Sequence, residues 1–259
     1  MITGWGNHPR IKAEVAEPLN LEQLQDGLNS RSVLPRGLAR SYGDASLNDH
    51  VVSMLKCNRI IELDELNGEI ECESGVSLAQ IIKLILPKGF FLPVTPGTRY
   101  VTVGGAIASD VHGKNHHVDG CFSKHLIFFD ILTQDGKTQR CSPTQNTQLY
   151  YRTIGGMGLS GIITMVRFKL KKVETAYIKQ RVIKCRDLSE IMAAFEEHRN
   201  ATYSVAWLDT TQKGNSIGRS VLWLGEHALQ SDLAPSSKEP LVLPKPNKLN
   251  LPFFLPSFT

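Results

Sequence analysis

Residues 96–117 read PGTRYVTVGGAIASDVHGKNHH and combine glycines and small side chains with a cluster of histidines. Small residues allow a large ligand to lie against the backbone. The spacing of His112 and His116 would suit a metal ion on a helix, but Gly113 disfavours that helix and no cysteine or carboxylate ligand follows. We therefore predict a ligand-binding loop without a metal. Taken singly, each histidine also suits a loop residue that bonds to backbone or solvent.

A second glycine-containing loop, RGLARSYGD, spans residues 36–44 between strand-like runs at 32–35 and 51–55. Successive backbone N–H groups in such a loop can form a concave anion site, with Ser41, Arg36 and Arg40 as further donors. The same residues also suit an ordinary basic surface turn. On this stretch alone, a diphosphate site and a surface turn remain equal alternatives.

A third stretch, GMGLSG at residues 156–161, matches the GxGxxG pattern of dinucleotide-binding Rossmann domains. That pattern binds a pyrophosphate when a strand precedes it and a helix begins inside it. Here a strand-like run, residues 162–170, follows the glycines, and no acidic residue stands at the distance expected for ribose binding. We therefore predict that this stretch is not a Rossmann site.

The remaining sequence predicts a mixture of strands and helices. A hairpin is expected around Asn67-Gly68, because this dipeptide favours tight turns. Ser77 and Gln80 form a capping box that predicts the start of a helix. The predicted strands are 60–63, 69–73, 126–133, 162–170, 204–208 and 220–224, and the predicted helices are 78–86 and 188–198.

Composition restricts the classes of protein to which the chain can belong. Among its 259 residues, 41% are hydrophobic and 21% are charged, which is typical of a globular protein. The net charge of +4 is spread along the chain, so no nucleic-acid partner is expected. The five cysteines are odd in number and widely spaced, which favours free thiols in a reducing compartment. No apolar run suits a signal peptide or a membrane span, so the expected location is cytoplasmic, with peripheral attachment to an inner membrane left open.

The glycine-rich stretches together resemble the FAD-contacting segments of the vanillyl-alcohol-oxidase class of flavoproteins. RGLARSYGD, TVGGAIASDVHGKNHH and GGMGLSGII are most similar, in this order, to the decaprenylphosphoryl-β-D-ribose oxidase family, the flavin subunits of a 2-epimerase. The resemblance implies an α+β fold with a PCMH-type FAD-binding domain of two subdomains. The domains that we expect are the FAD-binding domain at 4–175, the start of an incomplete substrate (cap) domain at 176–229, and a Pro-rich tail at 230–259.

The resemblance also implies roles for individual residues. In many relatives a histidine of the first loop bonds covalently to the flavin, whereas Arg40 stands at that position here, so noncovalent FAD is expected. His112 is implied to lie at the flavin ring beside the substrate as the catalytic residue. The residues implied to bind FAD are Pro35, Arg36, Gly37, Leu38, Ala39, Arg40, Ser41, Tyr42, Gly43, Asp44, Ala45, Gly97, Thr98, Thr102, Val103, Gly104, Gly105, Ser109, Asp110, Val111, Gly113, Gly156, Gly161 and Ile163.

The implied chemistry is the oxidation of a secondary alcohol on a sugar. The family's substrate is decaprenylphosphoryl-ribose, whose 2-keto product is reduced by a separate NAD(P)H-dependent partner to give an arabinose donor for the cell wall. An aldonolactone or alditol oxidase is the alternative enzyme, although Arg40 and the HGKNHH stretch both weigh against it. A third alternative is an FAD-binding remnant without turnover, because members of the family are considerably longer. A fragment, a shortened gene product and a chain that needs a second polypeptide all agree with this length.

Overall fold

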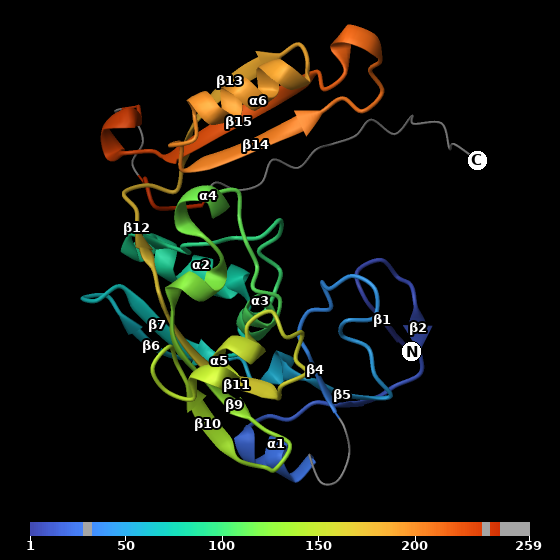
Figure 1. Cartoon of the computed structure of the whole chain (residues 1–259). Coiled ribbons are helices and arrows are strands. Elements are labelled where there is room, and N and C mark those ends of the chain that lie inside the picture. Colours follow the sequence, from blue (N-terminus) through green and yellow to red (C-terminus); the bar gives the residue numbers. More distant parts are fainter. Residues whose placement is uncertain (28–32, 235–238, 244–259) are drawn as a thin grey trace, which may run out of the picture.

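The computed structural model describes residues 1–27, 33–234 and 239–243, and it has an α+β architecture (Figure 1). Its largest sheet has five antiparallel strands. In spatial order these strands are β10 (Thr138–Cys141), β9 (Leu126–Leu132), β11 (Ile162–Lys169), β7 (Glu69–Glu73) and β6 (Ile60–Asp64). The predicted hairpin around Asn67-Gly68 is therefore confirmed as β6 and β7.

Short helices cover one face of this sheet and form the main core with it. The largest of them, α2 (Leu78–Ile85), begins at the predicted capping box, in which Ser77 and Gln80 bond reciprocally. Four of its apolar residues, Leu78, Ile81, Ile82 and Ile85, are buried in the core. The other helices on this part of the chain are α3 (Val103–Ala108), α4 (His116–Asp119) and α5 (Thr147–Thr153).

The N-terminal elements form a separate layer on the right of Figure 1. Three parallel strands, β3 (Glu14–Ala16), β5 (His50–Ser53) and β4 (Leu34–Arg36), make a small sheet, and β1 (Ile2–Thr3) pairs with β2 (Arg10–Ile11). A second core joins this layer to the large sheet, since Leu24 of α1 (Leu21–Gly27) and Val52 pack with Leu132 and Ile162. The predicted strand 51–55 ends earlier than expected because Cys57 donates its N–H to Met54 and closes a 3₁₀ turn.

A three-stranded sheet forms the upper unit of Figure 1. Its order is β13 (Ile178–Cys185), β15 (Ser220–His227) and β14 (Tyr203–Leu208), and α6 (Leu188–Glu197) packs on one face. It follows β12 (Lys171–Lys172), which pairs with β8 (Phe90–Phe91). The 3₁₀ turns are Met54–Lys56, Leu86–Lys88, Phe122–His125, Gly214–Ser216 and Gln230–Asp232.

This unit lies where we expect the substrate domain to begin, and its boundaries stay a prediction. The predicted helix 188–198 and the strands 204–208 and 220–224 correspond to α6, β14 and β15. Most of the predicted tail, residues 235–238 and 244–259, lies outside the described residues. All five cysteines are free, as the sequence predicted. No helix in the described ranges is both long and apolar enough to cross a membrane.

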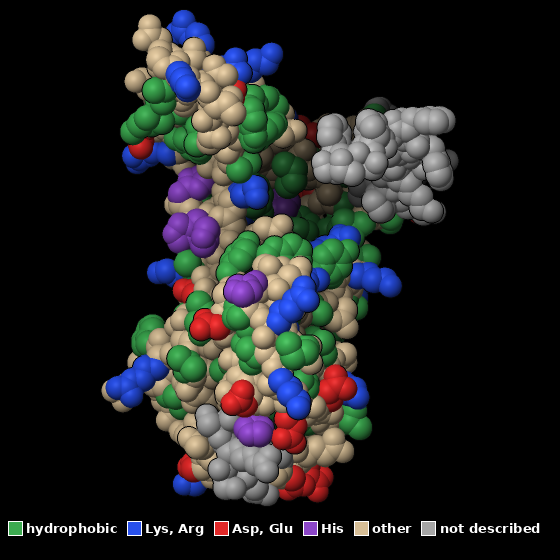
Figure 2. All heavy atoms as spheres, turned by 90° about the vertical axis from the view of Figure 1, so that its right-hand side faces the viewer, with side chains coloured by type: hydrophobic (Ala, Val, Ile, Leu, Met, Phe, Trp, Pro, Cys, Tyr) green, Lys and Arg blue, Asp and Glu red, His purple; other side chains and the backbone are tan. Residues whose placement is uncertain are grey.

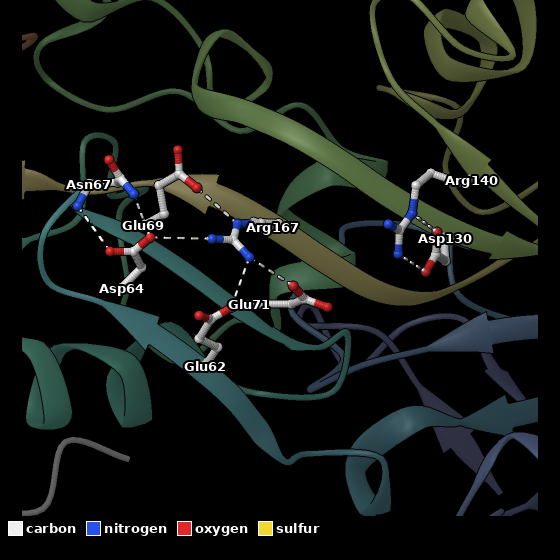
Figure 3. A network of polar contacts seen from close by, with 8 residues as sticks. All are labelled: Glu62, Asp64, Asn67, Glu69, Glu71, Asp130, Arg140 and Arg167. Atoms are coloured by element: carbon white, nitrogen blue, oxygen red, sulfur yellow. Dashed lines mark hydrogen bonds and ion pairs between the residues drawn. The ribbon is translucent and has the colours of Figure 1, made fainter.

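The outer face of the five-stranded sheet carries one arginine among four carboxylates (Figure 3). Arg167 on β11 bonds to Glu69 at 2.8 Å, Glu62 at 2.9 Å and Glu71 at 3.2 Å, and it lies 3.6 Å from Asp64. These contacts raise the pKa of Arg167, led by its hydrogen bond to Glu69. Because two neighbouring strands, β6 and β7, contribute acids to one cation on β11, Arg167 cancels the repulsion between these acids.

We expect Arg167→Met to destabilise the protein by about 2 kcal/mol at neutral pH, because four carboxylates then face one another without a cation. Chemical denaturation at neutral pH measures the loss of stability. Lys137→Met is the control, since Lys137 forms an exposed pair with Asp135. Equal losses in the two variants would contradict the bracing role of Arg167.

Candidate cofactor site

A cavity of about 650 Å³ lies where the N-terminal layer meets α3 and β11. Its volume falls within the range of sites that enclose cofactors, which is about 300–1,000 Å³. All three glycine-rich stretches of the sequence contribute to its walls. The lining residues are Trp5, Pro35, Arg36, Gly37, Leu38, Ala39, Arg40, Ser41, Tyr42, Ala45, Ser46, Met54, Ser74, Pro96, Gly97, Thr98, Val101, Thr102, Gly104, Gly105, Ala108, Ser109, Val111, Met157, Gly158, Gly161 and Ile163.

The first two stretches touch each other at Gly37 and Thr102. A Cβ atom on Gly37 would overlap the Oγ1 atom of Thr102, so only glycine allows this approach. Thr102 is held in place because its Oγ1 caps α3 by accepting from the N–H of Gly105 at 3.2 Å. The close contact therefore fixes the first loop against the start of α3.

The third stretch closes the cavity from the other side. Gly158 has a φ of +83°, and a Cβ atom there would lie 2.9 Å from Cγ of Pro35. The N–H of Met157 donates to the carbonyl of Ala108 at 2.8 Å, which ties this turn to α3. Helix α5 precedes the turn and strand β11 follows it, the reverse of the order that a Rossmann fingerprint needs.

The polar side chains of the first loop bond mainly to the loop itself. Arg36 donates to the carbonyl and hydroxyl oxygens of Ser46, at 2.9 and 3.1 Å, and to the carbonyl of Thr3. Ser41 donates its hydroxyl to Ser46 Oγ at 2.8 Å. Burial lowers the pKa of Arg36. In the structure these contacts brace the loop, and donation from Arg36 and Ser41 to a diphosphate stays a prediction.

Backbone conformation sets the cavity walls apart from ordinary turns. Ala39 and Met157 both line the cavity and have φ values of +57° and +53°, and Asp110, between two lining residues, has a φ of +37°. Left-handed geometry is unfavourable for residues other than glycine. Such strain gathers at ligand sites, where the surrounding structure enforces it.

One residue of the cavity lining has a buried polar atom that lacks a partner. Ser74 is only 2% exposed, and its Oγ has no hydrogen-bond partner among the described residues. A Cβ atom on Gly104 would lie 2.9 Å from Cβ of Ser74, so the second stretch also approaches this residue closely. A buried hydroxyl without a partner is costly unless a ligand bonds to it. Together with walls of small residues, this atom fits a large polar cofactor such as FAD.

Most of the residues predicted to bind FAD come together in the cavity. Those outside its lining are Gly43, Asp44, Val103, Asp110, Gly113 and Gly156. Val103 is fully buried in the core, the carboxylate of Asp110 accepts from the N–H of Ser123, and Gly156 packs against the carbonyl of Arg152. The cavity residues that sequence reasoning missed are Trp5, Ser46, Met54, Ser74, Pro96, Val101, Ala108, Met157 and Gly158. Of these, Met157 and Gly158 lie inside the GMGLSG stretch and could have been included.

His112 does not line the cavity but follows Val111, which does. It is exposed, forms an isolated β-bridge with Cys121, and its ring lies 5.3 Å from that of His116. Because His116 opens α4 while His112 is extended, the two histidines do not share a helix. The predicted place of His112 beside the flavin stays a prediction.

The loop after His112 connects the cavity region to the three-stranded sheet. Ser204 of β14 donates its N–H to the carbonyl of Lys114 at 3.0 Å, and His117 Nε2 lies 2.8 Å from the carbonyl of Ala201. Asn115, which is fully buried, anchors the loop by donating to Pro93 and Asp119. The loop that carries the predicted catalytic histidine is therefore held by both parts of the protein.

Comparison with known proteins identifies the family of this domain and its cofactor. Residues 15–142 match the FAD binding domain family. The chain contains an FAD binding domain. This match confirms FAD as the cofactor and confirms the predicted fold class, and it covers all of the first loop and all of the second stretch.

The relatives extend the resemblance beyond this domain. Decaprenylphosphoryl-β-D-ribose oxidase of Mycolicibacterium smegmatis is 36% identical over 99% of this chain and 58% of its own length. An "uncharacterized protein in mprA 5'region" of Streptomyces coelicolor is 35% identical over 71% of this chain and 51% of its own length. A putative D-arabinono-1,4-lactone oxidase of Neurospora crassa is 27% identical over 54% of this chain and 25% of its own length. The chain thus spans little more than half the length of the first two relatives, and the family resemblance seen in the motifs is confirmed.

We expect Gly37→Val to weaken FAD binding at least tenfold, because the new side chain pushes Thr102 and the start of α3 away from the first loop. Titration of the apoprotein with FAD, followed by flavin fluorescence, measures the effect. Ala193→Val is the control, since Ala193 is exposed on α6 and lies outside the cavity lining. Unchanged affinity in a folded Gly37→Val protein would contradict the proposed contact between the two stretches.

Ala39→Gly tests the strain in the first loop. Relief of the left-handed conformation should stabilise the protein by about 1 kcal/mol or leave it unchanged, because glycine also loses more entropy on folding. The same substitution at Ala193, within α6, should destabilise it by about 1 kcal/mol. Thermal unfolding compares the stability of the two variants. Equal losses of stability would mean that the backbone of Ala39 is not strained.

Proposed function

We propose that this chain is the FAD-binding part of an oxidoreductase that oxidises a secondary alcohol of a sugar, with decaprenylphosphoryl-ribose as substrate and its 2-keto form as product. The 36% identity to a decaprenylphosphoryl-β-D-ribose oxidase, over 99% of the chain, is the observation that carries the proposal. The cavity agrees with it, since the three stretches that carry the resemblance come together in its walls.

Residues at different positions have different roles in the proposed oxidation. When bound, FAD supplies an acceptor for the hydride of the sugar carbinol. Arg36 braces the first loop and Thr102 caps the start of α3 beside it, while Ser74 offers a hydroxyl to the bound group. His112 follows the lining residue Val111. Its proposed role is to accept the proton of the sugar hydroxyl, because an imidazole is suited to act as a general base. Lys114 and His117 contact the unit that contains the three-stranded sheet, and these contacts hold the loop in a fixed position relative to that unit.

The proposed product also defines a partner. A keto sugar has to be reduced to complete an epimerisation at this carbon, so an NAD(P)H-dependent reductase is the proposed second enzyme, in a pathway to cell-wall arabinan. The polyprenyl chain of the substrate resides in lipid, which supports a peripheral position of this protein at the inner membrane.

A lactone oxidase is the second candidate, because the Neurospora crassa relative carries that name. The first loop weighs against it. Arg40 stands where many flavin-linked relatives have a histidine, and it stacks on Trp5 at 4.9 Å instead.

Anaerobic mixing of the FAD-loaded chain with a polyprenylphosphoryl-β-D-ribose tests the substrate. We expect the flavin absorbance to bleach and the sugar to lose two hydrogens, measured by mass spectrometry. The same lipid phosphate without its sugar is the control. Bleaching by D-arabinono-1,4-lactone instead would favour the lactone oxidase, and a flavin that neither compound bleaches would indicate FAD binding without turnover.

His112→Asn tests the proton acceptor in the same assay. Bleaching should slow by about 100-fold or more, the typical contribution of a general base, while the FAD content stays constant. His50→Asn is the control, because His50 pairs with Glu14 in the parallel sheet. If the two variants bleach at the same rate, His112 has no part in the proton transfer.

A further inference from the structure

The first residues of the chain lie across the loop that binds the cofactor. Strands β1 and β2 pair Ile2 with Ile11 and Thr3 with Arg10, which folds residues 2–11 into a compact hairpin. The carbonyl of Thr3 accepts from Arg36, and the N–H of Trp5 donates to the carbonyl of Ser41 at 2.9 Å. The hairpin is thus bonded to the start and to the middle of the first loop.

The packing between hairpin and loop is tight. A Cβ atom on Gly4 would lie 2.9 Å from the carbonyl oxygen of Ser41 and 3.0 Å from that of Gly43. Gly4 is buried, although its neighbours on the C-terminal side are exposed. The backbone at residues 3–5 is therefore seated on residues 41–43, which places the next side chain, Trp5, at the cavity.

Trp5 is a large apolar residue with an unusual position. It lines the cavity but remains 53% exposed, so the protein core does not explain it. The guanidinium of Arg40 lies 4.9 Å from the centre of its ring, within the range of a cation–π interaction. On the face that carries the N-terminal elements, hydrophobic and basic side chains adjoin one another at mid-height of the molecule (Figure 2).

The pair of Trp5 and Arg40 lies where it can help to retain the cofactor. Arg40 cannot form a covalent flavin bond of the kind that histidine forms, so FAD has to be retained by contacts that open and close. The Trp5–Arg40 pair links the hairpin to the loop directly at the cavity, and neither side chain belongs to a buried core. Separating the pair, the Trp5–Ser41 hydrogen bond and the Arg36–Thr3 hydrogen bond would free the hairpin without unfolding the five-stranded sheet or the parallel sheet.

We propose that residues 2–11 form a clasp that retains noncovalent FAD, with the pair of Trp5 and Arg40 as its latch. The inference depends on the FAD binding domain but not on the proposed oxidation of a sugar. Trp5 acts by closing the site, and its loss accelerates the release of FAD without changing the reaction that the bound cofactor supports.

The test measures the rate of FAD release from the full chain, by the recovery of flavin fluorescence after dilution. Trp5→Ala should release FAD about fivefold faster or more, the change that corresponds to about 1 kcal/mol of cation–π interaction. Trp5→Phe keeps an aromatic face and should stay within about twofold of the parent chain. Trp207→Ala is the matched control, because Trp207 is 56% exposed but lies on β14 and outside the cavity lining.

A double-mutant cycle separates the latch from direct contacts with FAD. If Trp5 and Arg40 act as a pair, Trp5→Ala combined with Arg40→Met should release FAD no faster than the faster single variant. Additive effects would overturn the latch, because each side chain would then act on FAD independently. Release from Trp5→Ala at the parent rate, or a parent chain that binds no FAD, would overturn the clasp itself.

Discussion

The site depends on the contact between Gly37 and Thr102. These residues are far apart in the sequence and belong to different layers of the fold, and the contact leaves no room for a side chain on Gly37. Thr102 also caps α3, so the position of the first loop and the position of the helix are set together. Every other wall of the cavity is arranged around this junction, since Pro35 meets Gly158 and Gly104 meets Ser74. The strained backbone at Ala39 and Met157 follows from fitting two loops around one space.

Much of the fold could be predicted because its signals are local. Alternating apolar residues specified β6, β7 and β11, and the capping box at Ser77 and Gln80 specified where α2 begins. The order of strands in the sheet could not be predicted, because it depends on pairings between distant residues. The network around Arg167 shows the difference. Its four acids are visible in the sequence, but only the pairing of β11 with β7, and of β7 with β6, brings them to one cation.

The candidate site could be predicted where a glycine indicates that two segments of the backbone approach each other closely. Gly37, Gly104 and Gly161 all line the cavity, as their stretches indicated. The roles of the polar residues were harder to infer. The sequence predicts Arg36 and Ser41 as donors to a diphosphate, and the structure shows that they also close the first loop onto Ser46. Ser74 and Trp5 carry no local signal, because a strand end and a terminal hairpin bring them to the cavity from outside the glycine-rich stretches. No sequence pattern distinguishes them from ordinary surface or core residues.

The central claim is that this chain holds FAD noncovalently in the cavity between its N-terminal layer and α3. The most direct measurement is the visible absorption spectrum of the purified chain, recorded before and after acid precipitation, together with the ratio of flavin to protein. We expect a flavin spectrum at close to one FAD per chain and complete release of the flavin into the supernatant. A folded but colourless chain, even after incubation with FAD, would contradict a competent site, and flavin that stays with the precipitate would contradict noncovalent binding.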